Sequence, residues 1–315
     1  MMAAVIIASC LILLFLGVEF FLYRLVFCHP VKKRPEMHTV PDSRLYKMHK
    51  DKMLERVKET ERAPHESLTI KSYDGYMLAG KLYEFKKGAP LMIFFHGYHG
   101  IAEWDGYGFF KICADHDINI LMADERAHGM SEGNEISFGI NERHDCISWI
   151  KYAEMRFGSS TDIILAGVSM GAATVMMASE LGFPENVRCM IADCGYTEPS
   201  AMVKETVRKM KLPVKPVYAL IKLSARIFGH DDLNLEQAAA VSAVEKLTIP
   251  ILFIHGSEDS IVPVSMNDEL YEKCRSPKKR LVVAGADHAN SSMTDFGTYE
   301  REVWEFLNKN LTYAG

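Results

Sequence analysis

"IILAGVSMGAATVMMAS", residues 163–179, sets a serine between two glycines in the pattern Gly-x-Ser-x-Gly, centred on Ser169. The apolar run before the pattern is typical of a buried strand, and the Ala- and Met-rich run after it is typical of a helix. A sharp turn between a strand and a helix holds a serine hydroxyl clear of the sheet, and small residues beside it leave room for the backbone. The stretch therefore predicts that Ser169 is a nucleophile, with a buried turn serine as the plain alternative.

A serine nucleophile needs a base and an orienting acid, and both are available downstream. His288 stands in "VVAGADHAN", in the predicted turn after the last strand, and imidazole titrates close to neutral pH. The other eleven histidines lie in the N-terminal region, in helix-like segments or at loops and strand ends, and we interpret them as structural. Asp259, in "ILFIHGSEDSIVP", would fix the imidazole tautomer, with the neighbouring Glu258 as the alternative acid. The chain order Ser169, Asp259, His288 is the one expected for a serine on a strand-to-helix turn.

The region around these motifs predicts a mostly parallel sheet covered by helices on both faces. A hairpin is predicted at Asp74-Gly75, where the flanking residues alternate between apolar and polar. Short apolar runs then alternate with helix-like segments at residues 109–116, 141–157 and 171–181, which is typical of an α/β fold. In such sheets ligands bind at the carboxyl ends of the strands. Polar residues recur at those ends: His96, Asp124, Ser169, Asp193, Asp259 and His288.

Residues 197–247 interrupt this alternation with a long helical segment, which predicts a cap above the carboxyl edge of the sheet. Met202 and Tyr218 are the cap residues that we expect to contact substrate, because flexible Met side chains suit irregular apolar ligands. An apolar cap favours medium or aromatic acyl groups over acetyl. The alternative is that these helices pack against one another and have no role with substrate.

The N-terminal segment predicts a membrane span. Residues 3–27 contain only two charged side chains, Glu19 and Arg24, and about 20 apolar residues suffice to cross a bilayer. A cleaved signal peptide is the alternative, but no basic residue precedes the apolar run and aromatic residues follow it. Lys and Arg residues follow the span and none precedes it, so we expect a single-pass protein of the cell membrane with a cytoplasmic catalytic domain.

These patterns divide the chain into three parts: a membrane anchor at residues 1–27, a basic linker and helix at 28–67, and a catalytic domain at 68–315. Leu45, Met48, Leu54 and Val57 predict the helix in the second part, with a solvated tether as the alternative. Every catalytic motif lies after Leu68. We therefore expect a chain that lacks residues 1–30 to be soluble and active.

Composition excludes some classes of function. The formal net charge is -5, which does not suggest a nucleic-acid partner. The seven cysteines are scattered and form no Cys-x-x-Cys pair, which argues against a disulfide framework or a zinc site. The predicted chemistry requires neither a metal nor an organic cofactor.

The motifs "FFHGYHG", "DERAHGMSEG", "GVSMG", "FIHGSEDSIVP" and "GADHA" resemble those of the α/β-hydrolase superfamily, and within it the serine hydrolases called Hydrolase-4 or S33-like. The chain is similar to their membrane-anchored bacterial members, and the resemblance covers about residues 68–311. It implies an oxyanion hole made by the backbone N–H groups of Met170 and Tyr98, and the Tyr98 side chain is also a candidate for lining the pocket. One departure is Ala127, which stands where relatives usually have glycine.

Together these observations predict a serine hydrolase that cleaves carboxylic esters or thioesters through a Ser-His-Asp triad and an acyl-enzyme intermediate. Its substrate is expected to be a small acyl ester or another amphiphile. A peptidase of the S33-like type is the alternative within the class. A binding protein that has the fold but no catalytic activity is the alternative outside it.

Overall fold

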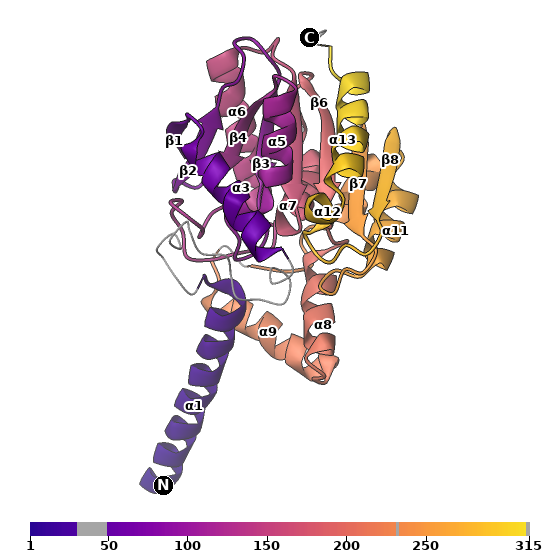
Figure 1. Cartoon of the computed structure of the whole chain (residues 1–315). Coiled ribbons are helices and arrows are strands. Elements are labelled where there is room, and N and C mark those ends of the chain that lie inside the picture. Colours follow the sequence, from indigo (N-terminus) through magenta and orange to yellow (C-terminus); the bar gives the residue numbers. More distant parts are fainter. Residues whose placement is uncertain (30–48, 231–232, 313–315) are drawn as a thin grey trace.

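The computed structural model describes residues 1–29, 49–230 and 233–312, and Figure 1 shows their arrangement. The strands of these residues form one mixed sheet in the order β1-β2-β4-β3-β5-β6-β7-β8. β2 runs antiparallel to both of its neighbours, and the remaining pairs are parallel. The strands are β1 (Glu66–Lys71), β2 (Met77–Tyr83), β3 (Leu91–Phe95), β4 (Asn119–Ala123), β5 (Ile163–Val168), β6 (Val187–Asp193), β7 (Ile251–Gly256) and β8 (Lys278–Val283). The predicted α/β-hydrolase fold is confirmed, and so is the hairpin at Asp74-Gly75, which joins β1 to β2.

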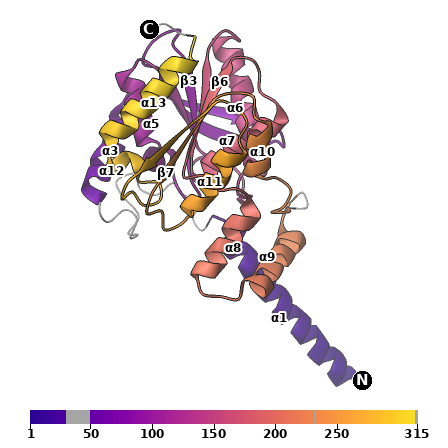
Figure 2. The ribbon, with the colours of Figure 1, turned by 90° about the vertical axis from the view of Figure 1, so that its right-hand side faces the viewer.

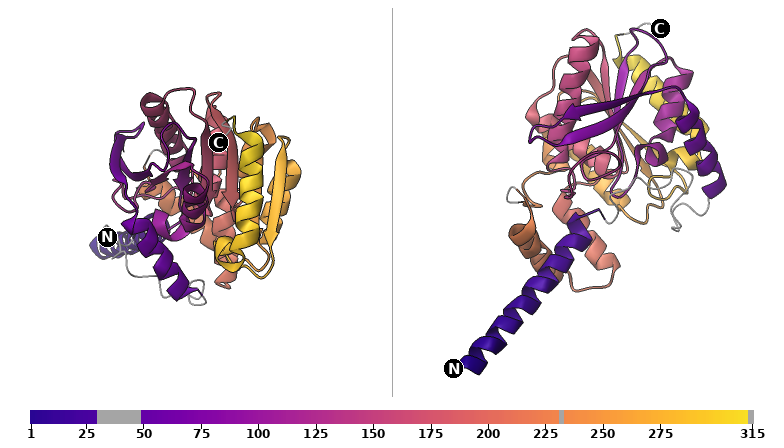
Figure 3. Two further views of the ribbon diagram at one scale, coloured as in Figure 1. Left: turned by 45° about the horizontal axis from the view of Figure 1, so that its top comes forward. Right: turned by 90° about the vertical axis from the view of Figure 1, so that its left-hand side faces the viewer.

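Helices cover both faces of the sheet because the central strands are apolar on both sides. In β3, Leu91, Ile93 and Phe95 pack in the same core cluster as residues of α6 and α7, whereas Met92 and Phe94 pack with residues of α5 and α13. Figures 2 and 3 show the sheet between these two helical layers. The helices are α1 (Met2–Phe27), α3 (Lys50–Arg62), α4 (Ala102–Asp105), α5 (Tyr107–Asp115), α6 (Glu142–Phe157), α7 (Met170–Ala178), the short 3-10 helix η1 (Ser179–Leu181), α8 (Pro199–Lys209), α9 (Val214–Phe228), α10 (Ala240–Lys246), α11 (Val264–Lys273), α12 (Ser291–Thr294) and α13 (Phe296–Asn310).

The segment that was predicted to form a cap divides into two parts. α8 and α9 project from the sheet on the same side as α1 (Figures 1 and 2). α10 instead packs against α7 and α11, within the helical layer of the domain. Buried residues of α10 such as Ala240 and Val244 belong to the core cluster that also includes α7, so of the segment 197–247 only α8 and α9 project from the sheet.

α1 projects from the domain with its N-terminal end free (Figure 3). Residues 1–18 are exposed, and α1 is long and apolar enough to cross a membrane. Its last third differs, because Glu19, Tyr23 and Phe27, spaced four residues apart, are buried against the domain. The predicted linker residues 30–41, together with Leu45 and Met48 of the predicted helix, lie outside the described residues, whereas Leu54 and Val57 belong to α3.

Candidate active site

Ser169 occupies the turn between β5 and α7. Its backbone has φ 55° and ψ -113°, a conformation that residues other than glycine rarely adopt, and its N–H donates to the carbonyl of Asp193 over 2.8 Å. The two flanking glycines explain how the turn is possible. A Cβ on Gly167 would lie 2.3 Å from the carbonyl group of Gly171, and a Cβ on Gly171 would lie 2.1 Å from the carbonyl oxygen of Phe95. The glycines therefore allow close backbone contacts that hold the serine hydroxyl at the carboxyl edge of the sheet.

The structure brings the three predicted site residues together, with His288 between Ser169 and Asp259. Its Nε2 is 2.8 Å from the Ser169 hydroxyl, and its Nδ1 is 2.7 Å from Oδ2 of Asp259. The three residues come from the turns after β5, β7 and β8, so the parallel sheet brings together side chains that are far apart in sequence. Because an ionised carboxylate only accepts hydrogen bonds, Nδ1 of His288 carries a hydrogen and donates a hydrogen bond to Asp259. In a neutral ring Nε2 is then unprotonated, and it accepts the hydrogen bond of the Ser169 hydroxyl.

Asp259 is held from several sides. Its Oδ1 accepts from the N–H groups of Ile261 (2.8 Å) and Val262 (2.7 Å), and its Oδ2 lies 3.2 Å from Nε2 of His255. Burial opposes ionisation of Asp259, but its hydrogen bonds with His255 and His288 hold the pKa of this carboxyl group well below its usual range. Glu258, the alternative acid, is exposed. Asp259 is thus ionised at neutral pH and oriented toward His288.

His255, for which the sequence indicates only a structural role, lies beside Asp259 in the site. It is fully buried, and its Nε2 faces both Asp259 and the carbonyl oxygen of Val262, which is 3.0 Å away. Burial lowers the pKa of His255, but the hydrogen bond and charge of Asp259 outweigh this effect and raise the pKa above its usual value. A histidine four residues before the acid, at the end of the same strand, was the available signal.

The loop of residues 96–99 lies beside the nucleophile. A Cβ on Gly97 would be 3.3 Å from the Cβ of Ser169, and the Gly97 N–H donates to Oδ2 of Asp105 over 2.7 Å. Burial raises the pKa of Asp105 to about 6. Within the described residues, the backbone N–H groups of Tyr98 and Met170, the two predicted oxyanion donors, donate no hydrogen bond.

Buried histidines connect this loop to the segment of residues 125–128. Nε2 of His128 accepts the His99 N–H over 3.0 Å, and Nε2 of His96 accepts the Glu125 N–H over 3.0 Å. Burial lowers the pKa of His128 well below its usual value, which keeps this ring neutral. Ala127, the departure from the superfamily pattern, has φ 62°, a left-handed conformation that glycine adopts without hindrance.

A cavity of about 510 Å³ lies above Ser169 and His288. Met202 lines it, as predicted, but Tyr218 does not. Tyr218 lies one position, or 100° of helical rotation, beyond the lining residue Val217 on α9, and its hydroxyl instead donates to Glu236 over 3.3 Å. The other lining residues are Leu22, Leu25, Val26, Gly97, Tyr98, Asp105, Phe138, Tyr196, Val203, Thr206, Val207, Met210, Leu212, Ile221 and Ile261.

The wall that α1 contributes to this cavity was not predicted. The carbonyl oxygen of Val26 accepts the Tyr98 hydroxyl over 3.0 Å, which ties the end of α1 to the loop beside the nucleophile. The Tyr23 hydroxyl donates to Oε2 of Glu135 over 2.7 Å, and the Ile136 N–H donates to the carbonyl of Phe27 over 2.7 Å. The expectation that residues 1–30 are dispensable conflicts with these contacts, because they make α1 part of the domain.

In the described ranges, one group of side chains has its potential metal-ligand atoms close enough together to hold a metal ion. Ligand atoms of Cys194, Asp259 and His288 lie within 4.8 Å of one another. Burial and the neighbouring carboxylates of Asp193 and Asp259 raise the pKa of the Cys194 thiol well above its usual value, so it stays protonated, whereas metals bind the thiolate. This chemistry does not favour a metal here.

Solved structures with similar folds include esterases. The esterase Pf2001 of Pyrococcus furiosus superposes with a TM-score of 0.65 at 20% sequence identity, over 88% of this chain and 97% of the esterase. Est1E of Butyrivibrio proteoclasticus, solved with ferulic acid bound, superposes with a TM-score of 0.60 at 21% identity, over 78% of this chain and all of that chain (100%). At these identities the likeness concerns the fold.

Relatives detected by sequence agree with the fold. "Uncharacterized protein YqkD" of Bacillus subtilis is 28% identical over 191 residues, which cover 60% of this chain and 62% of that protein, so less than two thirds of its length is matched. Human alpha/beta hydrolase domain-containing protein 17B is 32% identical over 71 residues, which cover 22% of this chain and 24% of that protein.

The predicted superfamily is confirmed, although the family model that matches is not the one named from the motifs. The model of the prolyl oligopeptidase family (Peptidase_S9) matches residues 131–313, a range that includes Ser169, Asp259 and His288 and more than half of the chain. With its α/β-hydrolase fold, the chain belongs to the prolyl oligopeptidase family.

Proposed function

We propose that the protein is a membrane-bound serine hydrolase that cleaves carboxylic esters or thioesters with Ser169, His288 and Asp259. The observation that carries this proposal is the hydrogen-bonded chain of these residues, with contacts of 2.8 and 2.7 Å, at the base of a largely apolar cavity. The membership of a hydrolase family supports the reaction class.

The proposed reaction proceeds in two steps. Ser169 attacks the acyl carbonyl while its proton passes to Nε2 of His288, and the ionised Asp259 stabilises the resulting imidazolium. The backbone N–H groups of Tyr98 and Met170 bind the oxyanion. His288 then returns the proton to the leaving alcohol or thiol, and an acyl-enzyme remains. Water, activated by the same histidine, releases the acid and restores the serine.

The cavity favours esters with apolar acyl groups over peptides. Its lining includes aliphatic and Met side chains from three helices, and none of the described residues that line it is a Lys, Arg or Asn that could pair with a peptide. The hydroxyls of its two tyrosines, Tyr98 and Tyr196, bind backbone carbonyls of Val26 and Phe138 instead. The ferulic acid in the Est1E structure agrees with an aromatic acyl substrate class. A serine peptidase is the second candidate, because the family is named for an oligopeptidase.

Membrane attachment through α1 is part of the proposal. The helix is apolar and long enough, and the basic residues that follow it favour a cytoplasmic catalytic domain. Cleavage of a signal peptide would remove the docked residues that line the cavity, such as Leu25 and Val26. These contacts therefore favour an uncleaved membrane anchor over a cleaved signal peptide.

A fluorophosphonate probe tests the reaction class, because it reacts with activated serines. We expect labelling of the full-length protein in detergent, and loss of labelling in Ser169→Ala. p-Nitrophenyl esters and a prolyl p-nitroanilide, compared on the same preparation, then separate esterase from peptidase. Absence of labelling at Ser169 would support a binding protein without catalysis, and faster turnover of the anilide would support the peptidase.

A further inference from the structure

The mouth of the cavity lies between α1 and the turn that joins α8 to α9. Four residues both line the cavity and remain exposed: Leu25 of α1 (57% exposed), Thr206 of α8, Met210 (60%) and Leu212 (42%). The exposed rim is therefore mostly apolar, and one of its apolar side chains belongs to the membrane-span candidate itself. An apolar rim of this kind suits a lipid environment better than water.

The position of the mouth along α1 corresponds to the membrane interface. α1 has 26 residues, and at about 1.5 Å per residue it is roughly 39 Å long. A hydrocarbon layer of about 30 Å takes about 20 residues. A layer that begins near Ala3 is thus crossed by about Leu22, so Leu25 and Val26 lie at the depth where the ester groups of lipids meet the acyl chains.

α9 carries a second apolar surface that continues from α1. Pro216, Leu220, Leu223 and Ile227 are exposed and recur every three or four residues, which places them on one face of the helix. At the end of α9, Phe228 packs on Phe20 and Tyr23 of α1, with ring centroids 5.3 and 6.1 Å apart. We call Pro216, Leu220, Leu223 and Ile227 the α9 stripe.

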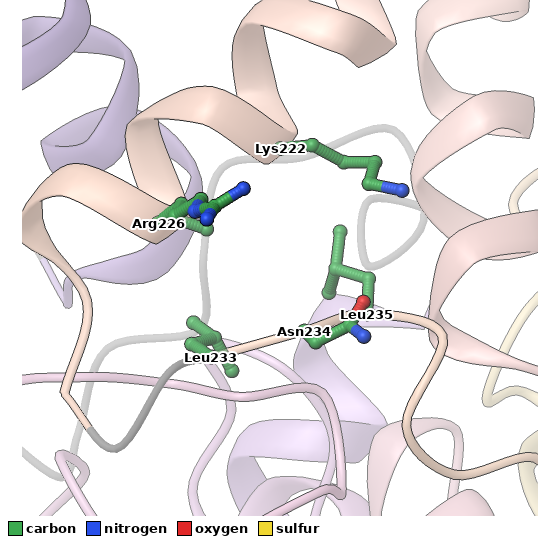
Figure 4. Close-up of a pocket in the computed structure, with 6 residues that line it drawn as sticks. Lys222, Arg226, Leu233, Asn234 and Leu235 are labelled. Atoms are coloured by element: carbon green, nitrogen blue, oxygen red, sulfur yellow. The ribbon is translucent and has the colours of Figure 1, made fainter.

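Two basic side chains lie on another face of α9 than the α9 stripe. Lys222 and Arg226 project from α9 over the segment Leu233–Leu235, beside a second cavity of about 390 Å³ (Figure 4). Lys222 is paired with Glu236 at 2.8 Å. A helix with an exposed apolar stripe on one face and basic side chains on another is typical of helices that lie in the plane of a membrane interface.

We infer that the enzyme takes its substrate from the bilayer: the acyl chain of an ester dissolved in the leaflet enters between α1 and the α8–α9 turn, while the α9 stripe rests in the same leaflet. Leu22, Leu25 and Val26 of α1 then form one wall of the acyl path. The substrate class is a long-chain ester whose carbonyl lies at headgroup level. This inference rests on the proposed esterase function.

The two apolar surfaces, on α1 and on α9, are continuous, which favours a lipid leaflet as the environment that covers them. The α9 stripe and the exposed part of α1 meet through Phe228 and Phe20, so the insertion of α1 brings the stripe to the same membrane surface. The exposed apolar residues of the cavity rim belong to α1 and to the α8–α9 turn, next to these surfaces. A substrate chain in the leaflet therefore reaches the cavity without crossing water.

The experiment uses the full-length protein in phosphatidylcholine vesicles with two substrates. 4-Methylumbelliferyl oleate partitions into the vesicles, whereas p-nitrophenyl acetate stays in the water. The double variant Leu220→Ser with Leu223→Ser should lower turnover of the oleate at least 10-fold and leave turnover of the acetate unchanged, because neither residue lines the cavity. Met155→Ser, which alters an exposed apolar residue of α6, is the matched control and should change neither rate.

A second variant tests the mouth. Leu25→Trp with Met210→Trp adds bulk at its rim, and Trp is tolerated at membrane interfaces. The ratio of oleate to acetate turnover should fall at least 10-fold, and Phe21→Trp, an exposed α1 residue that does not line the cavity, should leave the ratio unchanged.

The outcomes separate this inference from the proposed function. If fluorophosphonate labelling and acetate turnover persist but neither double variant changes the oleate-to-acetate ratio, entry from the bilayer is wrong and the esterase proposal stands. Equal hydrolysis of the oleate from vesicles and from a soluble albumin complex would also overturn it. If the unmodified protein neither reacts with the probe nor cleaves either ester, the proposed function itself is wrong.

Discussion

The base and the roof of the substrate cavity are built in different ways. At the base, Ser169, His288 and Asp259 stand at strand ends, and each is held by hydrogen bonds of 2.7–2.8 Å. The roof consists of α1, α8 and α9, whose contribution to the lining is mostly apolar and whose contacts are mainly packing. Hydrogen bonds demand particular atoms at particular positions, whereas apolar packing accepts many side chains of similar size. We therefore expect the base to fix the reaction and the roof to select the substrate.

Removal of the nucleophile should have the largest effect on the base of the cavity and the smallest on its roof. Ser169→Ala should reduce kcat by about 10⁶-fold, because a triad acts as a unit and loss of the nucleophile removes covalent catalysis. The roof should be unaffected, so binding of a long-chain acyl analogue should persist. Kinetics with p-nitrophenyl butyrate and a binding titration on the same variant measure the two properties. Residual activity above one hundredth of the original would mean that another residue is the nucleophile.

Substitution of the acid comes next in size. Asp259→Asn keeps the shape but presents an amide to His288, which favours the wrong imidazole tautomer and should lower kcat about 10⁴-fold. KM should change little, because Asp259 does not line the cavity. Steady-state kinetics give both values. Near-normal kcat in this variant would show that the acid has been assigned incorrectly.

The third test asks whether α1 belongs to the roof. Deletion of residues 1–29 removes the cavity wall and the Val26 carbonyl that holds Tyr98, and small displacements of catalytic groups cost about 10²-fold in rate. We expect a loss of about that size in kcat/KM for p-nitrophenyl octanoate. Deletion of residues 1–18 alone is the matched control, because it keeps the docked residues Glu19 to Phe27.

The two truncations are compared in detergent, and circular dichroism checks that both proteins are folded. If the longer deletion is as active as the shorter one, α1 acts only as an anchor and the wall it forms is not used.

The same contrast explains what could be predicted from the sequence. The strand-to-helix turn at Ser169, the order of the three catalytic candidates and the parallel sheet were predictable, because each depends on residue types at short, fixed spacings. The docking of α1 was not, because the contact of Tyr23 with Glu135 spans 112 positions and no motif marks it. The position of Tyr218 outside the cavity lining was not predictable either, because an apolar helix has more than one buried face, and sequence does not tell which one meets the cavity.

Substitution of His255, which contacts the carboxylate of Asp259, should have a smaller effect on kcat. His255→Leu removes the side chain that faces Oδ2 of Asp259 from its buried side, and loss of one hydrogen bond to a charged group should lower kcat about 10-fold. His255→Gln places an amide near the position of Nε2 and should recover most of the loss. Rescue by glutamine with an unchanged KM would assign His255 to positioning the acid. Equal damage in both variants would mean that His255 only fills space.

The finest test concerns the length of the acyl chain. Met202 lines the cavity from α8, and Met202→Ala creates room for additional methylene groups, each worth about 0.8 kcal/mol, or about fourfold in kcat/KM. The preferred chain in a series of p-nitrophenyl esters should therefore lengthen by about one or two carbons. Tyr218→Phe is the control, because its hydroxyl contacts Glu236 outside the cavity, and it should leave the chain-length profile unchanged. A profile that peaks at acetyl or propionyl esters in all three proteins would show that the roof helices pack against one another and do not select the acyl group.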